Sequence, residues 1–365
     1  MRADFLVAAD GHRSGVREQM QIAWPVAAPG QHMVSILFDA DLSDVIVQHA
    51  IFWIVLNKEL GFGAFVTIAT PGRWSVGVAF DPGRERLEDF DQTRCVGMIC
   101  AMTGLPDLRC TVINVGCWEQ TTAMAQHYRK GRVFPAGDSA HVWPPAGAMD
   151  ANTGIQDAHK LSWKLALHLR GMADEALLDT YGAERRPVAP ALSEFVQKRQ
   201  KARLSGPPDS DDLDDHTCIL GQRYHSDAII EAASLAVFGK TIARRAEAGA
   251  RAPHAWLAHQ GKRVSTLDLF HDAFVLLSED PAWVAAVEGV AKRSGLPVRA
   301  FLVGTGAAAL VDIDHTCHST YGIGDDCAVV VRPDGYVAWI GGVCGSTHTA
   351  QLAAVFGQLL GGPSQ

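Results

Sequence analysis

Long apolar runs are missing from this sequence. No stretch approaches the roughly 18 consecutive apolar residues of a membrane-spanning helix, so no membrane partner is expected. Basic blocks are missing as well: the formal net charge is −8 at pH 7, from 32 lysines and arginines against 40 aspartates and glutamates, which argues against nucleic acid as a partner. The opening residues, Met1 to Asp4, lead into no hydrophobic segment of a secretion signal, so we expect a cytoplasmic protein.

Several motifs that indicate a ligand site are also missing. The eight cysteines include no C-x-x-C pair, which predicts reduced thiols without redox chemistry. The G-x-G triplets, Gly61 to Gly63 and Gly304 to Gly306, lack a third glycine and do not connect a buried strand to a helix, so neither is expected to bind a dinucleotide. No metal site is predicted, because the acidic, histidine and cysteine residues between Asp312 and His318 follow no zinc spacing and favour a surface loop.

The segment Arg132 to Leu169 organises the rest of the chain. It begins with the pattern of a short buried strand, turns at Gly137-Asp138, passes a loop with Pro144-Pro145 and enters a helix near Asn152. Apolar residues at three- and four-residue spacing predict one buried face of this helix: Ala158, Leu161, Leu165 and Leu169. A carboxylate that ends a strand and the free N–H groups of a helix N-terminus can both be directed at one ligand.

Further motifs continue in order along the chain: Gly154-Ile155-Gln156-Asp157-Ala158-His159, Trp163-Lys164-Leu165, Tyr181 and Glu184-Arg185-Arg186-Pro187. Together with the Gly-Asp turn they resemble the second flavin-contacting motif of the class A FAD-dependent aromatic monooxygenases, the family of para-hydroxybenzoate hydroxylase. The resemblance is strongest to the branch that acts on phenols and aromatic polyketides. Near the N-terminus, Phe5 to Arg17 resembles the other signature of that family, G-A-D-G-x-x-S-x-V-R, with Ala8 in place of the first glycine.

The resemblance implies roles for individual residues. At the Gly137-Asp138 turn, the aspartate would hold the ribityl chain of FAD. The loop and the helix start would line the isoalloxazine ring with Pro145, Gly147 and Asn152. The Asp10-Gly11 turn would lie where FAD and nicotinamide meet and would stabilise the fold around them. We expect the Asp10 and Asp138 turns to lie side by side at one end of a shared sheet. The implied activity is hydroxylation of an aromatic polyketide or phenol, with FAD as cofactor and NAD(P)H as electron donor.

The family pattern is not complete at the N-terminus. The family begins with a strand, a G-x-G-x-x-G turn and a helix that takes the FAD pyrophosphate. This chain starts at Met1, just before the Asp-Gly strand. We therefore expect either a truncated chain or a lineage that no longer uses FAD as its relatives do. Without the leading strands a sheet edge would be exposed, which predicts a dimer or a partner chain that covers it.

The loop after Pro144-Pro145 also departs from the family. Its pattern there is x-G-G-x-G-x-N, and Ala148 and Asp150 replace two of the glycines. A carboxylate at Asp150, close to the N1–C2=O edge of the ring, would oppose the negative charge of reduced flavin. Alternatively, Asp150 turns away and caps the helix N-terminus. The sequence leaves both arrangements open.

Residues 33 to 80 predict an antiparallel sheet, from β-branched and aromatic runs separated by Gly, Pro and Asp. The runs are Met33 to Leu42, Gln48 to Asn57, Gly63 to Thr70 and Arg73 to Phe80. In the family this sheet roofs the substrate pocket, which makes these residues candidates for substrate contact: Phe52, Trp53, Asn57 and Trp74. Alternation places Phe52 and Trp53 on opposite faces, so at most one of that pair can touch substrate, and core packing is the alternative for each candidate.

The flanking segments complete the prediction. A helix is expected at Leu87 to Thr103, with Phe90, Cys95 and Ile99 on one face, and a strand at Cys110 to Glu119. A further helix at Leu177 to Lys201 is expected to break or kink at Pro187 and Pro190, before an exposed linker at Ser205 to His216. From about Pro253, strand and helix patterns favour a small thioredoxin-like unit: Phe274 to Leu277, Trp283 to Ser294, Val298 to Val303 and Ala328 to Val331.

The predicted fold class is α/β, or α+β overall. It combines a truncated FAD/NAD(P)-binding-type sheet, an antiparallel β substrate domain and a C-terminal thioredoxin-like domain. The predicted ranges are residues 1–20 and 118–204 for the remnant of the FAD-binding domain, 21–117 for the substrate domain, 205–252 for linker and helices, and 253–365 for the C-terminal domain.

Three functions agree with these patterns. The first is the FAD-dependent hydroxylase of an aromatic polyketide or phenol. The second is a flavin-free tailoring enzyme, in which Asp138, His141 and Asp150 act as acid and base in a cyclisation, dehydration or rearrangement. The third is a non-catalytic half-flavoprotein that needs a partner chain.

Overall fold

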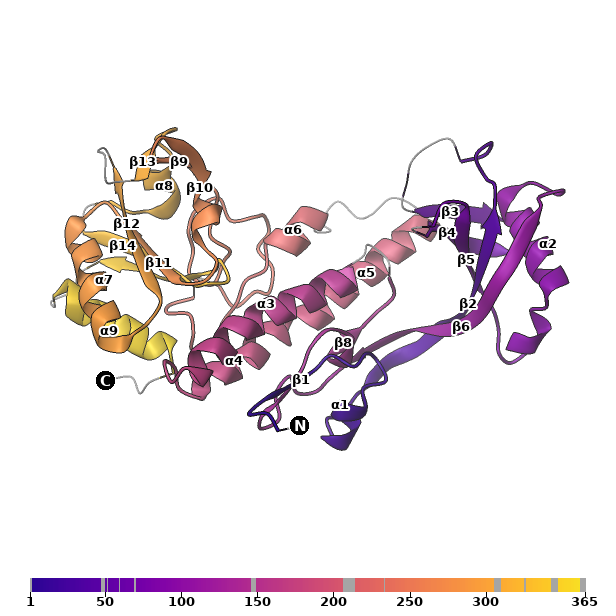
Figure 1. The fold of residues 1–365 in the computed structure, drawn as a ribbon, viewed down its shortest axis with the longest axis horizontal. Helices are drawn as coiled ribbons and strands as arrows, with labels where there is room; N and C mark the ends of the chain where they lie inside the picture. The colour runs from indigo at the N-terminus through magenta and orange to yellow at the C-terminus, as the bar shows by residue number, and fades with distance from the viewer. Residues whose placement is uncertain are drawn as a thin grey trace. The chain divides into compact units, whose positions relative to one another are not determined.

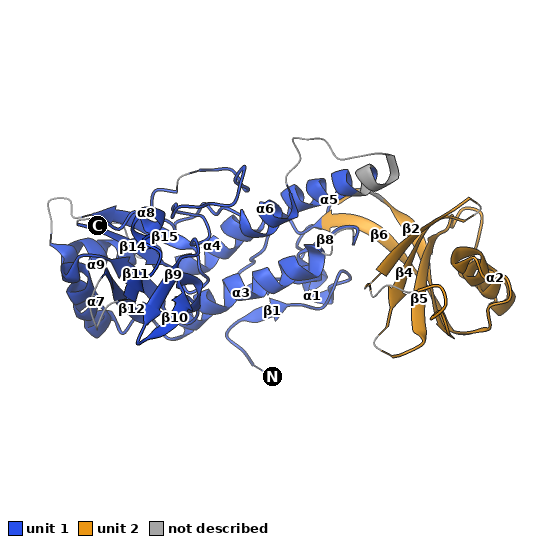
Figure 2. Cartoon of the chain, turned by 90° about the horizontal axis from the view of Figure 1, so that it is seen from above, with its two compact units in different colours: residues 1–25, 124–365 blue, residues 26–123 orange. Residues whose placement is uncertain are grey.

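A computed structural model describes residues 2–46, 50, 52–58, 60–68, 70–145, 149–205, 214–232, 234–304, 310–324, 326–342 and 347–361. The chain divides into two compact units (Figure 2), one formed by Val26–Ala123 and the other by Met1–Pro25 together with Met124–Gln365. We name them the sheet unit and the main unit. Among the described residues, no helix is long and apolar enough to cross a membrane.

The sheet unit is an antiparallel sheet with a helix on one face (Figure 1). Within it the strand order is β3-β4-β5-β2-β6, and each neighbouring pair is antiparallel. The strands are β2 (Val26–Ala40), β3 (Phe52–Asn57), β4 (Gly61–Thr67), β5 (Arg73–Ala79) and β6 (Cys110–Met124). The predicted antiparallel sheet is confirmed, although β2 and β6 extend beyond the runs that predicted them.

Helix α2 (Gln92–Thr103) covers one face of this sheet and follows a short 3₁₀ turn, η1 (Leu87–Asp89). The helix begins later than predicted because the Asp91 carboxylate caps it, accepting a backbone N–H of the first turn at 2.8 Å. It ends at Gly104, whose φ of +72° suits glycine. The positions predicted to face the core are buried there: Phe90, Cys95 and Ile99.

The main unit begins with a pair of short parallel strands, β1 (Leu6–Ala8) and β7 (Val133–Pro135). A short helix, α1 (Gly15–Gln19), follows β1, and a 3₁₀ turn, η2 (Gly137–Ser139), with the short strand β8 (His141–Val142), follows β7. The next elements are helices: α3 (Met149–Leu169), α4 (Ala176–Arg185), α5 (Val188–Ser205) and α6 (Asp215–Leu220).

Two helix predictions are correct only in part. Helix α3 begins at Met149, earlier than the predicted start near Asn152. The break expected at Pro187 is confirmed, since the segment Leu177 to Lys201 forms two helices, α4 and α5, which part at Arg186-Pro187. Pro190 causes no break, because it lies in the first turn of α5, where its missing N–H removes no helical hydrogen bond.

The buried face of α3 differs from the predicted one. Leu161 is buried and Leu165 is half-buried, but Ala158 and Leu169 are exposed. The buried residues of α3 include several with charged side chains: Asp157, Lys160 and Lys164. Apolar periodicity predicted the wrong face because it counts only apolar residues, whereas this helix buries charges that are paired with residues of other elements.

The C-terminal part of the main unit is a seven-stranded mixed sheet in the order β10-β9-β13-β12-β11-β14-β15. Its strands are β9 (Trp256–His259), β10 (Lys262–Ser265), β11 (Phe274–Ser278), β12 (Val298–Gly304), β13 (Leu310–Asp312), β14 (Cys327–Val331) and β15 (Val337–Gly342). Helix α7 (Pro281–Ser294) joins the parallel strands β11 and β12, and the antiparallel hairpin β14–β15 lies beside β11. Helix α9 (His348–Leu359) shares a core with α7, and a 3₁₀ turn, η3 (Thr266–Leu269), precedes β11. This is the predicted thioredoxin-like arrangement, extended by β9, β10 and β13.

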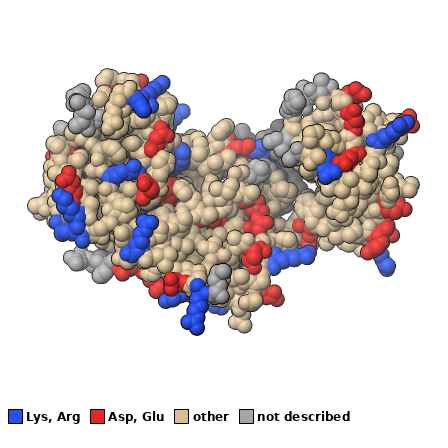
Figure 3. Space-filling view, viewed as in Figure 1, with Lys and Arg blue, Asp and Glu red and all other residues tan. Residues whose placement is uncertain are grey.

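The acidic and histidine-rich segment from Asp312 onward starts a helix. The Asp312 carboxylate accepts the backbone N–H groups of Thr316 and Cys317 at 3.1 and 2.7 Å, next to α8 (Cys317–Tyr321). In the described ranges, no three His, Cys, Asp or Glu side chains gather as metal ligands would. On the face drawn in Figure 3, the basic and acidic side chains are interspersed.

Candidate functional site

The two turns that carry the family signatures lie side by side. Because β1 and β7 are parallel neighbours, the turns that follow them leave the same end of the pair. Ser139 joins these turns: its hydroxyl donates to the Asp10 carboxylate at 3.0 Å and accepts the Gly11 N–H at 3.1 Å. The predicted adjacency of the Asp10 and Asp138 turns is confirmed.

The Asp10 carboxylate is engaged by its own turn. It accepts hydrogen bonds from the Ser14 hydroxyl at 2.5 Å and from the Val16 N–H at 3.1 Å, which fixes the start of α1. Burial acts to raise the pKa of Asp10, but the hydrogen bonds from Ser14, Val16 and Ser139 outweigh it and lower that pKa to about 2. Gly11 supplies the left-handed residue of the turn, with φ of +86°. The contact of Asp10 and Gly11 with a cofactor stays a prediction.

The Gly137-Asp138 turn touches helix α3 through its backbone. Gly137 has φ of +57°, and a Cβ atom on Gly154 of α3 would lie 3.0 Å from the Gly137 Cα atom. The two glycines therefore permit an approach that larger residues would prevent. The Gly137 N–H donates to the Asp157 carboxylate at 3.1 Å, and the side chain of Asp138 is left exposed beside the helix.

His141, on β8, is buried and bound to a carboxylate at each ring nitrogen. Its Nε2 lies 2.7 Å from an Asp157 oxygen and its Nδ1 lies 3.1 Å from an Asp150 oxygen. Burial acts to lower the pKa of His141, but the two carboxylates outweigh it and raise that pKa to about 9. The ring is therefore an imidazolium at neutral pH, with both N–H groups donated. It stacks on the Trp143 indole and the Tyr128 ring, at centroid distances of 4.8 and 6.3 Å.

Of the two arrangements left open for Asp150, capping of helix α3 is excluded. Met149 is already helical, so Asp150 lies inside the first turn, after the cap position. The Asp150 carboxylate instead binds His141 Nδ1 and accepts the backbone N–H of Trp143. Burial raises the pKa of Asp150, and the His141 imidazolium opposes that rise. Because the imidazolium offsets the carboxylate, Asp150 presents no isolated negative charge at the start of α3.

Asp157 and Arg185 are the site residues that the sequence predictions missed. One Asp157 oxygen accepts from His141 and Gly137, and the other accepts the Arg185 Nε–H at 2.7 Å. Burial acts to raise the pKa of Asp157, but the charges of Arg185 and His141 outweigh it and lower that pKa. Both residues lie within the quoted family motifs, which was a signal of their importance, but no spacing in the sequence indicated that they pair.

The other predicted flavin contacts lie around this cluster. Asp138 and Pro145 are exposed, Asn152 is exposed in the first turn of α3, and Gly147 falls outside the described residues. Two buried polar atoms next to His141, Tyr128 Oη and Trp143 Nε1, have no hydrogen-bond partner among the residues that the structure describes. An exposed carboxylate beside the electropositive start of a 21-residue helix fits a ligand that carries hydroxyl groups and negative charge, as FAD does.

The sheet unit has a covered face and an open face, and three predicted substrate contacts lie on the covered one. The Trp53 and Trp74 rings pack edge to face at 5.9 Å in the core under α2. Asn57 Nδ2 donates to the carbonyl of Ala101 in α2 at 2.9 Å. The core alternative therefore accounts for these three residues, because their side chains are directed away from the open face. Phe52 alternates to the open face, where 48% of its surface is exposed.

The open face has a row of small residues across its strands. The register places Ile54 opposite Ala64, then Ala64 opposite Gly77, Gly77 opposite Ser35 and Ser35 opposite Gly116. We name Ala64, Gly77, Ser35 and Gly116 the small-residue row. Larger side chains flank it on the same face: Phe52, Leu56, Val66 and Trp118. The Trp118 indole N–H donates to the Ser35 hydroxyl at 2.9 Å, which places both on this face.

Comparison with known proteins gives matches at both ends of the chain. Residues 1–196 match the family model described as FAD binding domain, and residues 245–363 match the one described as Aromatic-ring hydroxylase, C-terminal. The chain is 40% identical to tetracenomycin A2 monooxygenase-dioxygenase of Streptomyces glaucescens, over 93% of this chain and 62% of that protein. It is 38% identical to an aklavinone 12-hydroxylase of Streptomyces purpurascens, over 93% of this chain and 64% of that protein.

A solved structure shows the same fold. The chain resembles aklavinone-11 hydroxylase, solved in a ternary complex with FAD and aklavinone, with a TM-score of 0.89 and 35% sequence identity. The similarity covers 98% of this chain and 67% of that one. The chain thus spans less than two thirds of the length of the two curated relatives above, at 62% and 64%.

Proposed function

The chain belongs to the family of FAD-dependent aromatic-ring hydroxylases, and we propose from this that it is an FAD-dependent monooxygenase that hydroxylates an aromatic polyketide or a phenol. The observation that carries the proposal is the junction in the main unit. There the Asp10 and Asp138 turns are joined by Ser139 and touch the start of α3. This junction brings together an exposed carboxylate and a helix N-terminus, the groups needed for a ribityl chain and a flavin ring.

Each residue has a role in this proposal. Asp138 would accept hydrogen bonds from the ribityl hydroxyl groups of FAD, and Pro145 and Asn152 would line the ring. The first N–H groups of α3 would stabilise negative charge at the edge of the ring. Bound FAD, reduced by NAD(P)H, would supply the activation of oxygen. The His141 imidazolium neutralises Asp150, so that this carboxylate does not cancel the positive end of the helix.

The flavin-free alternative has less support from the geometry. In that alternative Asp138, His141 and Asp150 exchange protons with a ligand. His141 is buried and both of its ring nitrogens are held by carboxylates, so it is poorly placed for such exchange. We assign His141 to holding Asp150 and Asp157 in place.

The open face of the sheet unit is the proposed substrate face. Exposed apolar side chains on it include Phe52, Ile54, Leu56 and Val66, and the Asp39–Arg73 ion pair lies at one end of the same face. The small-residue row lies low between larger side chains, with Met33 and the Trp118 indole at its border, and such a shallow strip suits contact with a flat ring. Of the four residues predicted to touch substrate, Phe52 is the one that we retain.

A second polypeptide is the proposed partner in addition to the small aromatic substrate. Large apolar side chains of the main unit are exposed on β1 and on α3: Leu6, Val7, Ile155 and Leu169. Among the described residues, β1 pairs only with β7. Exposed apolar surface beside a strand with one edge unpaired in the described part of the chain favours coverage by a further chain segment, in a dimer or in a partner chain. A cytoplasmic location also stays a prediction.

The absorption spectrum of the purified chain, mixed with FAD and passed through a desalting column, tests the cofactor. We expect flavin bands with about one FAD per chain, and NAD(P)H consumption that increases when an aromatic polyketide is added. Asp138→Ala is expected to lose most of the bound FAD, whereas Asp107→Ala, at an exposed carboxylate of the sheet unit, is expected to retain it. A colourless wild-type chain that still converts the polyketide without NAD(P)H would contradict the proposal.

A further inference from the structure

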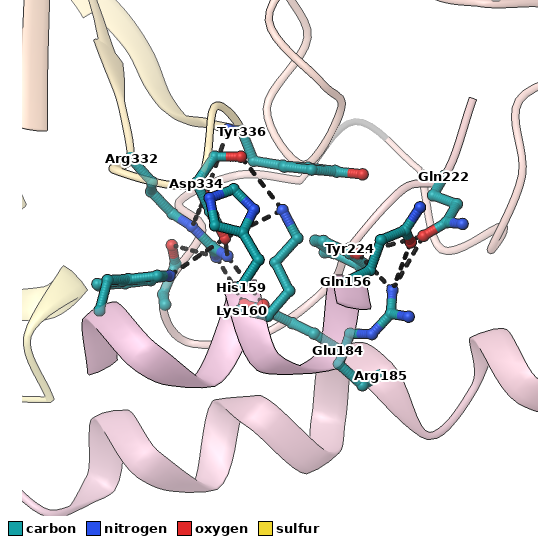
Figure 4. Close-up of polar contacts among 12 residues, drawn as sticks. Gln156, His159, Lys160, Glu184, Arg185, Gln222, Tyr224, Arg332, Asp334 and Tyr336 are labelled. Atoms are coloured by element: carbon teal, nitrogen blue, oxygen red, sulfur yellow. Dashed lines mark hydrogen bonds and ion pairs between the residues drawn. The ribbon is translucent and has the colours of Figure 1, made fainter. Parts of the chain in front are cut away.

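A buried ionic cluster connects the C-terminal sheet to helices α3 and α4 (Figure 4). Arg332 and Asp334 belong to the turn between β14 and β15, residues 332–336, which we name the ionic turn. Arg332 binds both oxygens of Glu184 on α4, at 2.6 and 2.9 Å, and binds Asp334 at 2.5 Å. Lys164 of α3 completes the cluster by donating to Glu184 at 2.9 Å. All four side chains are buried.

Each of the two helices has one charge directed at the site and a nearby charge directed at the ionic turn. On α3, Asp157 binds His141, while Lys160 lies 3.2 Å from the Asp334 carbonyl oxygen and 3.8 Å from the centre of the Tyr336 ring. On α4, Arg185 binds Asp157, and its chain neighbour Glu184 binds Arg332. A displacement of the ionic turn would therefore move both members of the Asp157–Arg185 pair.

Aromatic rings provide a third connection between the ionic turn and the site. The Tyr336 ring stacks on the Tyr224 ring, with centroids 4.4 Å apart. The Tyr224 hydroxyl accepts a hydrogen bond from Arg185 Nη1 at 2.7 Å. Figure 4 shows Lys160 extending from α3 toward Tyr336 and Asp334, with Arg185 directed toward Tyr224 and Gln222. The guanidinium of Arg185 is thus held from the C-terminal sheet on one side and from Asp157 on the other.

Burial makes this arrangement specific. A buried charge that loses its partner strongly destabilises the fold, so alternative placements of the ionic turn against α3 and α4 are disfavoured. The cost does not come from shape alone, since Lys160, Lys164, Arg185 and Arg332 would each need a new counter-charge. The cluster consequently fixes a single position of the turn.

We propose that the ionic turn positions the Asp157–His141 pair, acting through Lys160 on α3 and Glu184 on α4. The C-terminal sheet is then part of the machinery of the site, although none of its residues touches His141. Arg332, Asp334 and Tyr336 are positioning residues. The proposal concerns the apoprotein and does not depend on the function proposed above.

Trp143 provides a readout that does not require FAD. An imidazolium quenches the fluorescence of an indole stacked on it, and His141 stacks on Trp143. Among the residues that the structure describes, the titratable and aromatic groups that face His141 are Asp150 and Asp157 from α3, Trp143, and Tyr128. Subtracting the signal of Trp143→Phe isolates this indole in the full-length chain. We expect its fluorescence to increase as the pH is raised through the pKa of His141, about 9.

The decisive variant is Arg332→Met, which removes the charge while keeping a long side chain. We expect the carboxylates to separate from His141, so that the midpoint of the Trp143 titration falls by about one pH unit or more, toward the ordinary value of about 6.5. Val329→Ala, in the core of the same sheet, is the matched control, since it lowers stability without disturbing the ionic turn. Its midpoint is expected to stay at that of the wild type.

Two outcomes would overturn the proposal. One is that the Trp143 titration midpoint of Arg332→Met equals that of the wild type, while this variant loses as much thermal stability as Val329→Ala does. If Arg332→Met does not fold, Arg332→Lys decides, because it keeps the charge and loses the two-pronged contact with Glu184. For Arg332→Lys we expect a smaller downward shift of the midpoint, and an unchanged midpoint would equally contradict the proposal.

Discussion

Two interiors of the molecule differ in character. Under α2, the sheet unit packs aliphatic, aromatic and sulfur-containing side chains, for example Ile36, Phe38 and Met98. Between α3, α4 and the ionic turn, the main unit buries charges that pair with one another. The apolar interior gains stability roughly in proportion to the area it buries, and it tolerates near-isosteric exchange. The ionic interior is stable only while each charge keeps its partner. It therefore contributes more to selecting one arrangement of the elements than to the free energy of unfolding.

Removing one charge from the ionic interior should cause the largest loss of stability among the substitutions compared here. Glu184→Leu leaves Arg332 and Lys164 without their shared counter-charge, and we expect the free energy of unfolding to fall by about 3–5 kcal/mol. Urea unfolding followed by circular dichroism measures it. The control is Glu194→Leu, which removes an exposed partner of Lys198 on α5 and should cost about 0–1 kcal/mol. Equal losses in the two variants would contradict the comparison.

The pH dependence of stability should isolate His141. The ordinary pKa of its side chain is 6.5, and its pKa in the folded chain is about 9, so its stabilising contribution is complete below pH 6.5 and lost as the pH rises through 9. Burial lowers the pKa of Lys160 to about 7 from 10.5, which gives the opposite slope above pH 7. The quantity to measure is therefore the difference in free energy of unfolding between the wild type and His141→Gln. We expect this difference to shrink by roughly 1–3 kcal/mol over this pH range. A constant difference from pH 6 to pH 9 would show that His141 does not titrate as proposed.

Two glycine-to-alanine substitutions, one in each unit, compare how closely the backbone is packed in the two units. Gly154→Ala places a Cβ atom 3.0 Å from the Gly137 Cα atom, so we expect a loss of about 1 kcal/mol. Gly97→Ala, within α2, meets no atom within 4 Å and should raise stability by about 0.5–1 kcal/mol, since alanine favours a helix. Thermal unfolding of both variants shows whether each substitution raises or lowers stability. A gain in both would mean that the turn and α3 do not touch as described.

Trimming the apolar interior should have a small effect. Ile36→Val removes one methylene group from the core under α2, and the expected loss is about 0.5–1.5 kcal/mol. The measurement is the same urea unfolding as for Glu184→Leu. A loss as large as that of Glu184→Leu would erase the distinction between the two interiors.

The sequence was sufficient for the features that depend on local pattern. The strand-turn signatures at Asp10 and Asp138, the antiparallel sheet and the C-terminal α/β arrangement follow from alternation, periodicity and motifs that lie close together in the chain. The adjacency of the two signature turns could be predicted because parallel strands bring their carboxyl ends to one edge.

Other features could not be predicted because they depend on pairing between distant residues. The buried face of α3 includes Lys160 and Lys164, which look like surface residues until their partners in other elements are known. For Asp150 the sequence leaves open a cap or a free charge, because its pairing with His141 is a tertiary contact that no local pattern indicates. For Trp53 and Trp74, alternation indicates that side chains change faces, but only the position of α2 decides which face is covered.

The small-residue row also has an evolutionary consequence. Its members come from four different strands, β2, β4, β5 and β6, so each can be replaced by a larger residue independently of the others. If this face binds substrate as proposed, the thickness of the bound molecule would be adjustable in separate small steps, at positions distant in sequence. A lineage would then change the range of molecules it accepts without altering the core under α2 or the ionic cluster of the main unit.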